Sequence, residues 1–193
     1  ERVGVDIHPD PHAPATAHTG VGFSDLGLLT NLPFDLAYQA AEAFTAALQK
    51  RTKAAGFMKT LLLQRICSSF ASGRSTAEKM LRRETIEDEE QTRLVEETLS
   101  ALTPEEAGHL RKIVEELSRP EARDPKLAAV RHFLTEQRTE GKTWLQHGCI
   151  VFSQYYDTVY WIGAEIAKAL SGEPVGVYAG AGKSGLFRGG EFA

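Results

Sequence analysis

The sequence predicts a mainly helical protein that ends in a partial α/β unit. Apolar residues recur at helical spacing through most of residues 31–135. Two short apolar runs follow, at 149–152 and 175–178, with an amphipathic stretch between them. The glycine-rich segment 179–185 comes directly after the second run. The last third therefore has the order strand, helix, strand and loop, which is typical of the parallel crossover unit of an α/β sheet.

The composition is that of an ordinary globular domain. Of the 193 residues, 42% are hydrophobic and 25% are charged. We expect no membrane span, because no apolar run approaches the roughly 20 residues that one requires. Cys67 and Cys149 fall in a predicted helix and a predicted strand, so we expect buried thiols of a cytoplasmic protein. The first residue is Glu1 and not methionine, which is compatible with a fragment of a longer protein.

The first domain that we expect is an entry segment, residues 1–30, rich in proline, glycine and histidine. It contains one predicted strand, Val3 to Ile7, followed by a linker. Five potential metal ligands in it have spacings that match no standard zinc pattern, so we expect no metal. These residues are Asp6, His8, Asp10, His12 and His18.

The second expected domain, residues 31–123, is helical. Pro33 suits the first turn of a helix that reaches about Lys50. A second helix is predicted over 57–71, with Gly73 as its terminating residue. Ser75 to Glu78 has the form of a capping box, which predicts a third helix toward Arg83.

Two further helices, over 85–101 and 103–118, form a predicted acidic hairpin insertion spanning about residues 85–122. Thr103 to Glu106 is a second capping box, with proline at the first helical position. A sixth helix carries Leu127 and Leu134. It opens the third expected domain, residues 124–193, which contains the α/β unit.

Charge is segregated along the helical region. Residues 50–83 hold nine basic residues and one acidic residue, a net charge of +8. Residues 84–122 hold twelve acidic and four basic residues, a net charge of −8. The basic segment can meet phosphate. Equally, the two segments can face each other or be solvated.

The candidate site lies at the ends of the two predicted strands, because ligands of α/β sheets sit beyond the carboxyl ends of the strands. Ser153 and Gln154 close the first strand, and Gly180 and Lys183 follow the second, with Arg188 further along. Hydroxyls, main-chain amides and cations suit phosphate oxygens. The alternatives are that Ser153 caps the next helix and that the glycine-rich segment is a surface loop.

Asp157 would be an even better helix cap than Ser153. The glycine-rich segment is not a nucleoside-triphosphate P-loop. That motif needs a glycine where Val177 stands, and a helix directly after the Lys-Ser pair.

No combination of residues predicts a catalytic centre. His147 lies close to Cys149 in the sequence, but a thiol in a buried strand is a poor nucleophile. We expect four aromatic residues at the start of the crossover helix to serve the core or a domain interface, with base stacking as the alternative. They are Tyr155, Tyr156, Tyr160 and Trp161.

Four segments resemble motifs of the Swi/Snf-type ATPases of helicase superfamily two, over roughly residues 30–83 and 124–193. Residues 149–158, CIVFSQYYDT, look like the motif that opens their second RecA-like domain, an apolar strand followed by Phe-Ser-Gln. Residues 63–69, LQRICSS, resemble their helical Gln-Leu-Arg-Lys-Ile-Cys segment, with the Ser-Ser-Phe continuation of bacterial branches. Residues 124–127 resemble the lead-in helix, and residues 177–188 resemble the next motif.

The resemblance implies a piece of an ATP-dependent DNA helicase or translocase, with the inter-lobe helices and the start of the second RecA-like lobe. Its partners would be double-stranded DNA and the first RecA-like lobe, with ATP and Mg²⁺ as cofactors of the parent protein. The Walker lysine, the Asp-Glu metal site and the arginine finger have no counterpart here. We therefore expect no cofactor and no activity in this piece alone. Arg65, Arg74 and Lys79 would line the duplex.

The competing hypothesis is a non-enzymatic helical module. In that case the acidic hairpin would dock a protein partner.

Overall fold

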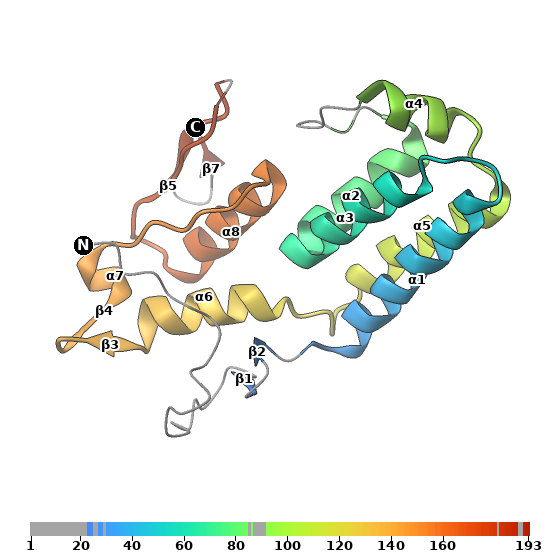
Figure 1. Ribbon diagram of the computed structural model, residues 1–193. Helices are drawn as coiled ribbons and strands as arrows, with labels where there is room; N and C mark the ends of the chain where they lie inside the picture. Colours follow the sequence, from blue (N-terminus) through green and yellow to red (C-terminus); the bar gives the residue numbers. More distant parts are fainter. Residues whose placement is uncertain are drawn as a thin grey trace. The chain divides into compact units, whose positions relative to one another are not determined.

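The computed structural model describes residues 23–24, 27–28, 30–84, 86, 92–180, 182–188 and 191–193 (Figure 1). The chain divides into two compact units, one of residues 1–31 and 123–150, the other of residues 32–122 and 151–193. Two of these boundaries fall close to those expected, and the third divides residues 124–193. The predicted strand Val3 to Ile7 and the histidine-rich segment lie outside the described residues.

The first unit contains short strands and two helices, of which α6 is the longer. They are β1 (Phe23–Ser24), β2 (Gly27–Leu28), α6 (Pro125–Thr135), β3 (Arg138–Thr139), β4 (Lys142–Thr143) and α7 (Trp144–His147). The Asp124 carboxylate accepts bonds from the first amides of α6, which is N-capping. The antiparallel pair β3–β4 turns through Glu140 and Gly141, both with positive φ.

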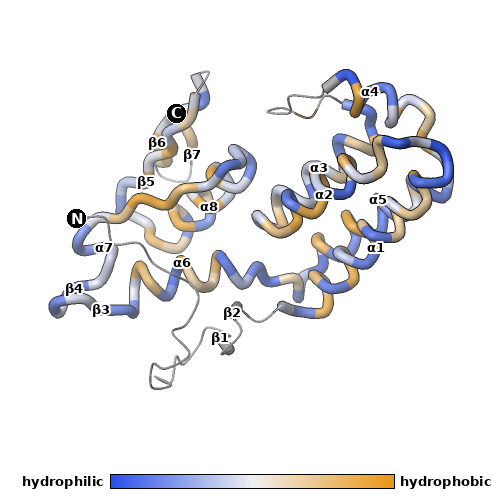
Figure 2. The backbone as a smooth tube through the Cα atoms, viewed as in Figure 1, coloured by the Kyte–Doolittle hydropathy of each residue, from blue (hydrophilic) through white to orange (hydrophobic). Residues whose placement is uncertain are grey.

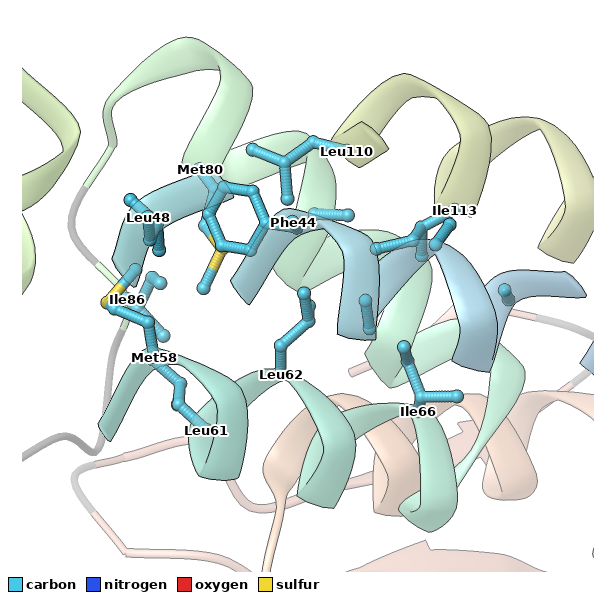
Figure 3. Close-up of a cluster of buried hydrophobic side chains, with 14 of the residues drawn as sticks. Phe44, Leu48, Met58, Leu61, Leu62, Ile66, Met80, Ile86, Leu110 and Ile113 are labelled. Carbon is cyan, nitrogen blue, oxygen red and sulfur yellow. The ribbon is translucent and has the colours of Figure 1, made fainter. Parts of the chain in front are cut away.

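Five helices form the larger part of the second unit. They are α1 (Leu32–Gln49), α2 (Ala55–Ser68), α3 (Phe70–Arg82), α4 (Thr92–Ser100) and α5 (Pro104–Leu117). Their core includes fully buried Phe44, Leu62, Met80, Leu110 and Ile113 (Figure 3). Because α5 supplies the last two side chains, the acidic segment is packed into this bundle.

The junction between α2 and α3 differs from the prediction. Gly73 does not end a helix, and Ser75 does not begin one; both lie inside α3. The turn occurs at Ser69, whose side chain accepts a bond from the Ser72 amide and so caps α3. Gly73 serves packing instead. A Cβ there would lie 2.8 Å from the Cα of Ile66, so α3 approaches α2 closely only because the side chain is absent.

The basic and acidic segments face each other at the start of α5. Lys50 contacts Glu105 at 3.2 Å, and both side chains are well exposed. Arg51 makes two short bonds to Glu106, whose side chain is 1% exposed. Glu106 also completes the predicted capping box with Thr103. For these four residues, the basic and acidic segments neutralise each other by forming ion pairs.

The Arg51–Glu106 pair predicts a pH-dependent stability. Burial raises the pKa of Glu106, but the bonds from Arg51 and Thr103 outweigh burial and hold that pKa below its usual value. Stability from a depressed carboxyl pKa is complete above the pKa of the unfolded chain, about 4.3, and is lost as pH falls through the folded value. In urea unfolding, we expect the stability difference between wild type and Glu106→Gln to be largest near neutrality and to shrink below about pH 4. A stability difference between the two proteins that stays constant down to low pH would contradict a depressed pKa at Glu106.

The described chain is mainly helical and carries a few short strands near its C-terminal end, which confirms the predicted fold class. The crossover helix expected between the two apolar runs is α8 (Tyr156–Ala169), and the second apolar run is β5 (Val175–Val177). Gly163 of α8 packs closely on Val177 and Phe187. Two further strands, β6 (Gly185–Arg188) and β7 (Glu191–Phe192), complete a three-stranded sheet.

The prediction of a parallel strand pair is wrong for the described residues. Strand β5 pairs antiparallel with β6, and residues 150–152 form no strand. The apolar run appears in Figure 2 as the orange segment leading into α8, and Ile150 and Phe152 are 78% and 88% exposed. Strand β6 follows β5 after a short loop, and closing a short loop costs little entropy, which favours the antiparallel pair.

The prediction of buried thiols is also wrong, because Cys67 and Cys149 are both exposed. Cys149 is exposed because the predicted strand that would bury it does not form. Cys67 lies on the solvent face of α2. Within the described part of the chain, no helix is long and apolar enough to cross a membrane.

Candidate nucleic-acid interface

A hollow of about 330 Å³ lies in the second unit, beside the start of α8. It brings together four predicted site residues, the pair Ser153 and Gln154 and the pair Gly180 and Lys183. Helix α8 and strand β5 separate the two pairs in the chain. The lining consists of Ser153, Gln154, Tyr156, Val159, Tyr178, Ala179, Gly180 and Lys183. The two predicted site segments therefore meet even though the predicted parallel pairing is absent.

Hydrogen bonds join the described residues of the glycine-rich loop at the hollow. The Ser184 hydroxyl donates to the Ala179 carbonyl at 2.7 Å and accepts from the Ala179 amide at 2.9 Å. The backbone turns at Gly182, where φ is +74°, a value that favours glycine. The amide of Lys183 donates to the carbonyl of Gly180, which closes the turn. These bonds hold the loop as a turn and not as a P-loop.

Lys183 gives the hollow its positive charge. Its Nζ lies 5.0 Å from the centre of the Tyr156 ring, within the range of a cation–π contact. None of the described lining residues carries a carboxylate. An anion in this hollow would meet a cation, hydroxyl and amide groups, and no opposing charge from the lining.

Ser153 and Asp157 do not cap α8. The N-cap position is Tyr155, which makes no side-chain capping bond. The Ser153 oxygen accepts a bond from the Tyr155 amide at 3.3 Å, which bends the chain just before the helix. The capping alternative is therefore wrong for both residues, and Ser153 lines the hollow.

Helix α2 fixes Tyr155, the residue between Gln154 and Tyr156. The Tyr155 hydroxyl donates to the Gln64 side-chain oxygen at 3.0 Å. The Arg65 guanidinium lies 4.0 Å from the centre of the Tyr155 ring, and Arg65 is only 3% exposed. Both contacts come from the segment 63–69.

Three further contacts tie α8 to α2 and α3, two of them at the α2–α3 junction. The Thr158 hydroxyl lies 2.8 Å from the hydroxyls of both Ser68 and Ser69. Lys79 of α3 contacts Asp157 at 3.7 Å. Polar contacts with α2 and α3 therefore hold the start of α8, which forms one side of the hollow, within a single unit.

The remaining predicted residues are not in the hollow. Arg65 is buried against Tyr155, so it supports the site and presents no surface to a ligand in this conformation. Lys79 is engaged with Asp157, and Arg74 lies 3.9 Å from Glu78. Arg188 is exposed on β6, outside the lining. The expected basic surface of Arg65, Arg74 and Lys79 is not a single exposed patch.

Two tyrosines line the hollow in a way that the sequence does not predict. The sequence predicts Tyr156 for the core or a domain interface, and it places Tyr178 at a strand end within the motif-like segment 177–188. In the structure Tyr156 is half-buried, Tyr178 is 94% exposed, and both line the hollow. The available signal was position, because Tyr178 directly precedes the turn that carries Gly180 and Lys183.

The described residues contain no group of three side chains placed to hold a metal ion. Comparison of the chain with family models, with curated proteins and with solved structures finds no match.

Proposed function

We propose that this hollow binds the phosphate backbone of nucleic acid, as one contact surface of an ATP-dependent DNA translocase of the Swi/Snf type. The observation that carries the proposal is the convergence of Ser153 and Gln154 with Gly180 and Lys183 around one hollow. Backbone amides, hydroxyls and lysine are the groups that contact phosphate in such complexes.

The contact between two motif-like segments supports the same proposal. Residues 63–69 resemble a helical segment of these ATPases, and residues 149–158 resemble the motif that opens their second lobe. Gln64 and Arg65 of the first hold Tyr155 of the second, and the hydroxyls of Ser68, Ser69 and Thr158 meet. Segments that are far apart in the chain thus form one structural unit.

In the proposed parent protein, ATP and Mg²⁺ would bind mainly on a first RecA-like lobe, and this surface would grip one strand while the lobes close. Such a motor would act in the cytoplasm, on double-stranded DNA as its overall substrate. Arg188 stays a proposed phosphate contact beside the hollow, and Arg74 an outer one. Arg65 and Lys79 would serve by holding α8.

The alternative of a protein-docking acidic hairpin has less support. Glu105 and Glu106 are paired with Lys50 and Arg51. Glu116 is fully buried and paired with Lys112 and Arg119. These carboxylates serve the folded bundle, which leaves fewer acidic groups for a partner.

Replacing Lys183 by alanine should weaken binding of a fluorescein-labelled oligonucleotide and make it less dependent on salt. One lost phosphate contact lowers the slope of log K against log salt by about 0.7 for a single strand and about 0.9 for a duplex. Fluorescence anisotropy at several salt concentrations measures both quantities. Lys168→Ala is the matched control, because Lys168 is an exposed lysine of α8 paired with Glu165.

We expect the control to keep the wild-type affinity and slope. Equal effects of the two substitutions would indicate general charge attraction and contradict a specific contact at Lys183. Circular dichroism of both variants checks that the helices are intact.

A further inference from the structure

Tyr178 is the least covered large side chain of the hollow. Tyr178 is 94% exposed, whereas Tyr156 lies under Lys183 and Val159 is half-buried. The turn after Tyr178 is fixed by the two bonds of Ser184 to Ala179. Tyr178 and Lys183 both line the hollow, so an exposed ring and a cation are available to one bound nucleotide.

This combination matches the physics of single-stranded nucleic-acid recognition. Such sites pair a cationic track for the backbone with aromatic rings on which unpaired bases stack. A base inside a duplex is already stacked on its neighbours and cannot offer its face to a protein ring. Backbone contacts alone would require no exposed aromatic side chain at this position.

We infer that Tyr178 stacks on an unpaired base of the nucleotide whose phosphate lies at Lys183, so that the hollow takes a single-stranded stretch. This inference rests on the proposed function and deepens it, because it names the form of nucleic acid at this surface. Tyr178 is then a binding residue, and Ser153 and Gln154 contact the adjoining backbone.

The test uses three fluorescein-labelled probes of equal length: oligothymidylate, the same backbone with abasic residues throughout, and a duplex. Stacking contributes about 1–3 kcal/mol per base, which corresponds to at least about fivefold in affinity. We expect Tyr178→Ala to bind oligothymidylate at least about fivefold more weakly and to bind the abasic probe as wild type does. Tyr178→Phe, which keeps the ring, should bind oligothymidylate as wild type does. Wild type should prefer oligothymidylate to the duplex.

Phe152→Ala is the control for a nearby exposed aromatic residue, because Phe152 is 88% exposed and does not line the hollow. It should leave all three affinities unchanged. An equal loss on oligothymidylate and the abasic probe, or no loss on either, would overturn stacking. If Lys183→Ala still weakens binding in that case, the phosphate surface stands without Tyr178. If Lys183→Ala and Tyr178→Ala are both without effect on every probe, both proposals fail.

Discussion

Glu106→Ala should destabilise the protein by about 3–5 kcal/mol, the cost of removing one partner of a buried ion pair. Two donors lose their partner: the Arg51 guanidinium and the Thr103 amide, whose bond is one half of the capping box of α5. Glu106 is 1% exposed, so water cannot readily replace it. Arg51 is 26% exposed and keeps its bond to the Thr98 carbonyl, which favours the lower end of this range. Urea denaturation followed by circular dichroism measures the change.

Glu105→Ala is the matched control, one residue earlier on the same helix. Its partner Lys50 and Glu105 itself are 69% and 59% exposed. Exposed pairs contribute about 0–1 kcal/mol, so we expect little change. Similar effects of the two substitutions would show that the Arg51–Glu106 contact does not anchor α5. A domain is stable by only about 5–15 kcal/mol, so the expected loss is a large share.

The helices could be predicted because their signals are local. The capping box at Thr103 and the proline at position 104 fixed the start of α5, and both bonds of the box are present. Pro33 marked the first turn of α1 in the same way. The apolar spacing over residues 31–135 includes Phe44 and Leu110, and both are fully buried.

The strand pairing could not be predicted, because pairing depends on which partners are available. An apolar run such as residues 150–152 has the composition of a buried strand, but burial needs neighbouring strands that the run itself does not specify. The antiparallel hairpin β5–β6 had no turn of a standard two-residue type to reveal it.

The candidate site was predictable in its position but not in its chemistry. Ser153 and Lys183 line the same hollow beside the start of α8, although of the two apolar runs only the second belongs to a sheet. The roles of Arg65 and Tyr178 depend on burial, which charge and residue type alone do not give. A cation in a basic segment suggested a phosphate contact at Arg65, whereas the structure packs it on Tyr155.

Gly73→Ala should destabilise the protein by about 1–3 kcal/mol, the usual cost of forcing extra atoms into a packed core. The added Cβ would lie 2.8 Å from both the Cα and the Cγ1 of Ile66 and 3.0 Å from Leu117. One of these atoms belongs to the backbone of α2, so a rotamer change cannot relieve the contact. Helix α3 must move away from α2, which weakens the junction that also carries the hydroxyl contacts of Ser69.

Gly108→Ala provides the opposite case within the same bundle. Gly108 lies inside α5, and a Cβ there would meet nothing within 4 Å. Replacing an unconstrained helical glycine by alanine stabilises a protein by about 0.4–1 kcal/mol, because the unfolded chain loses conformational freedom. Thermal unfolding should therefore shift downward for Gly73→Ala and upward for Gly108→Ala. Since helix propensity favours alanine at both positions, opposite signs would isolate the close approach of α2 and α3, and two upward shifts would refute it.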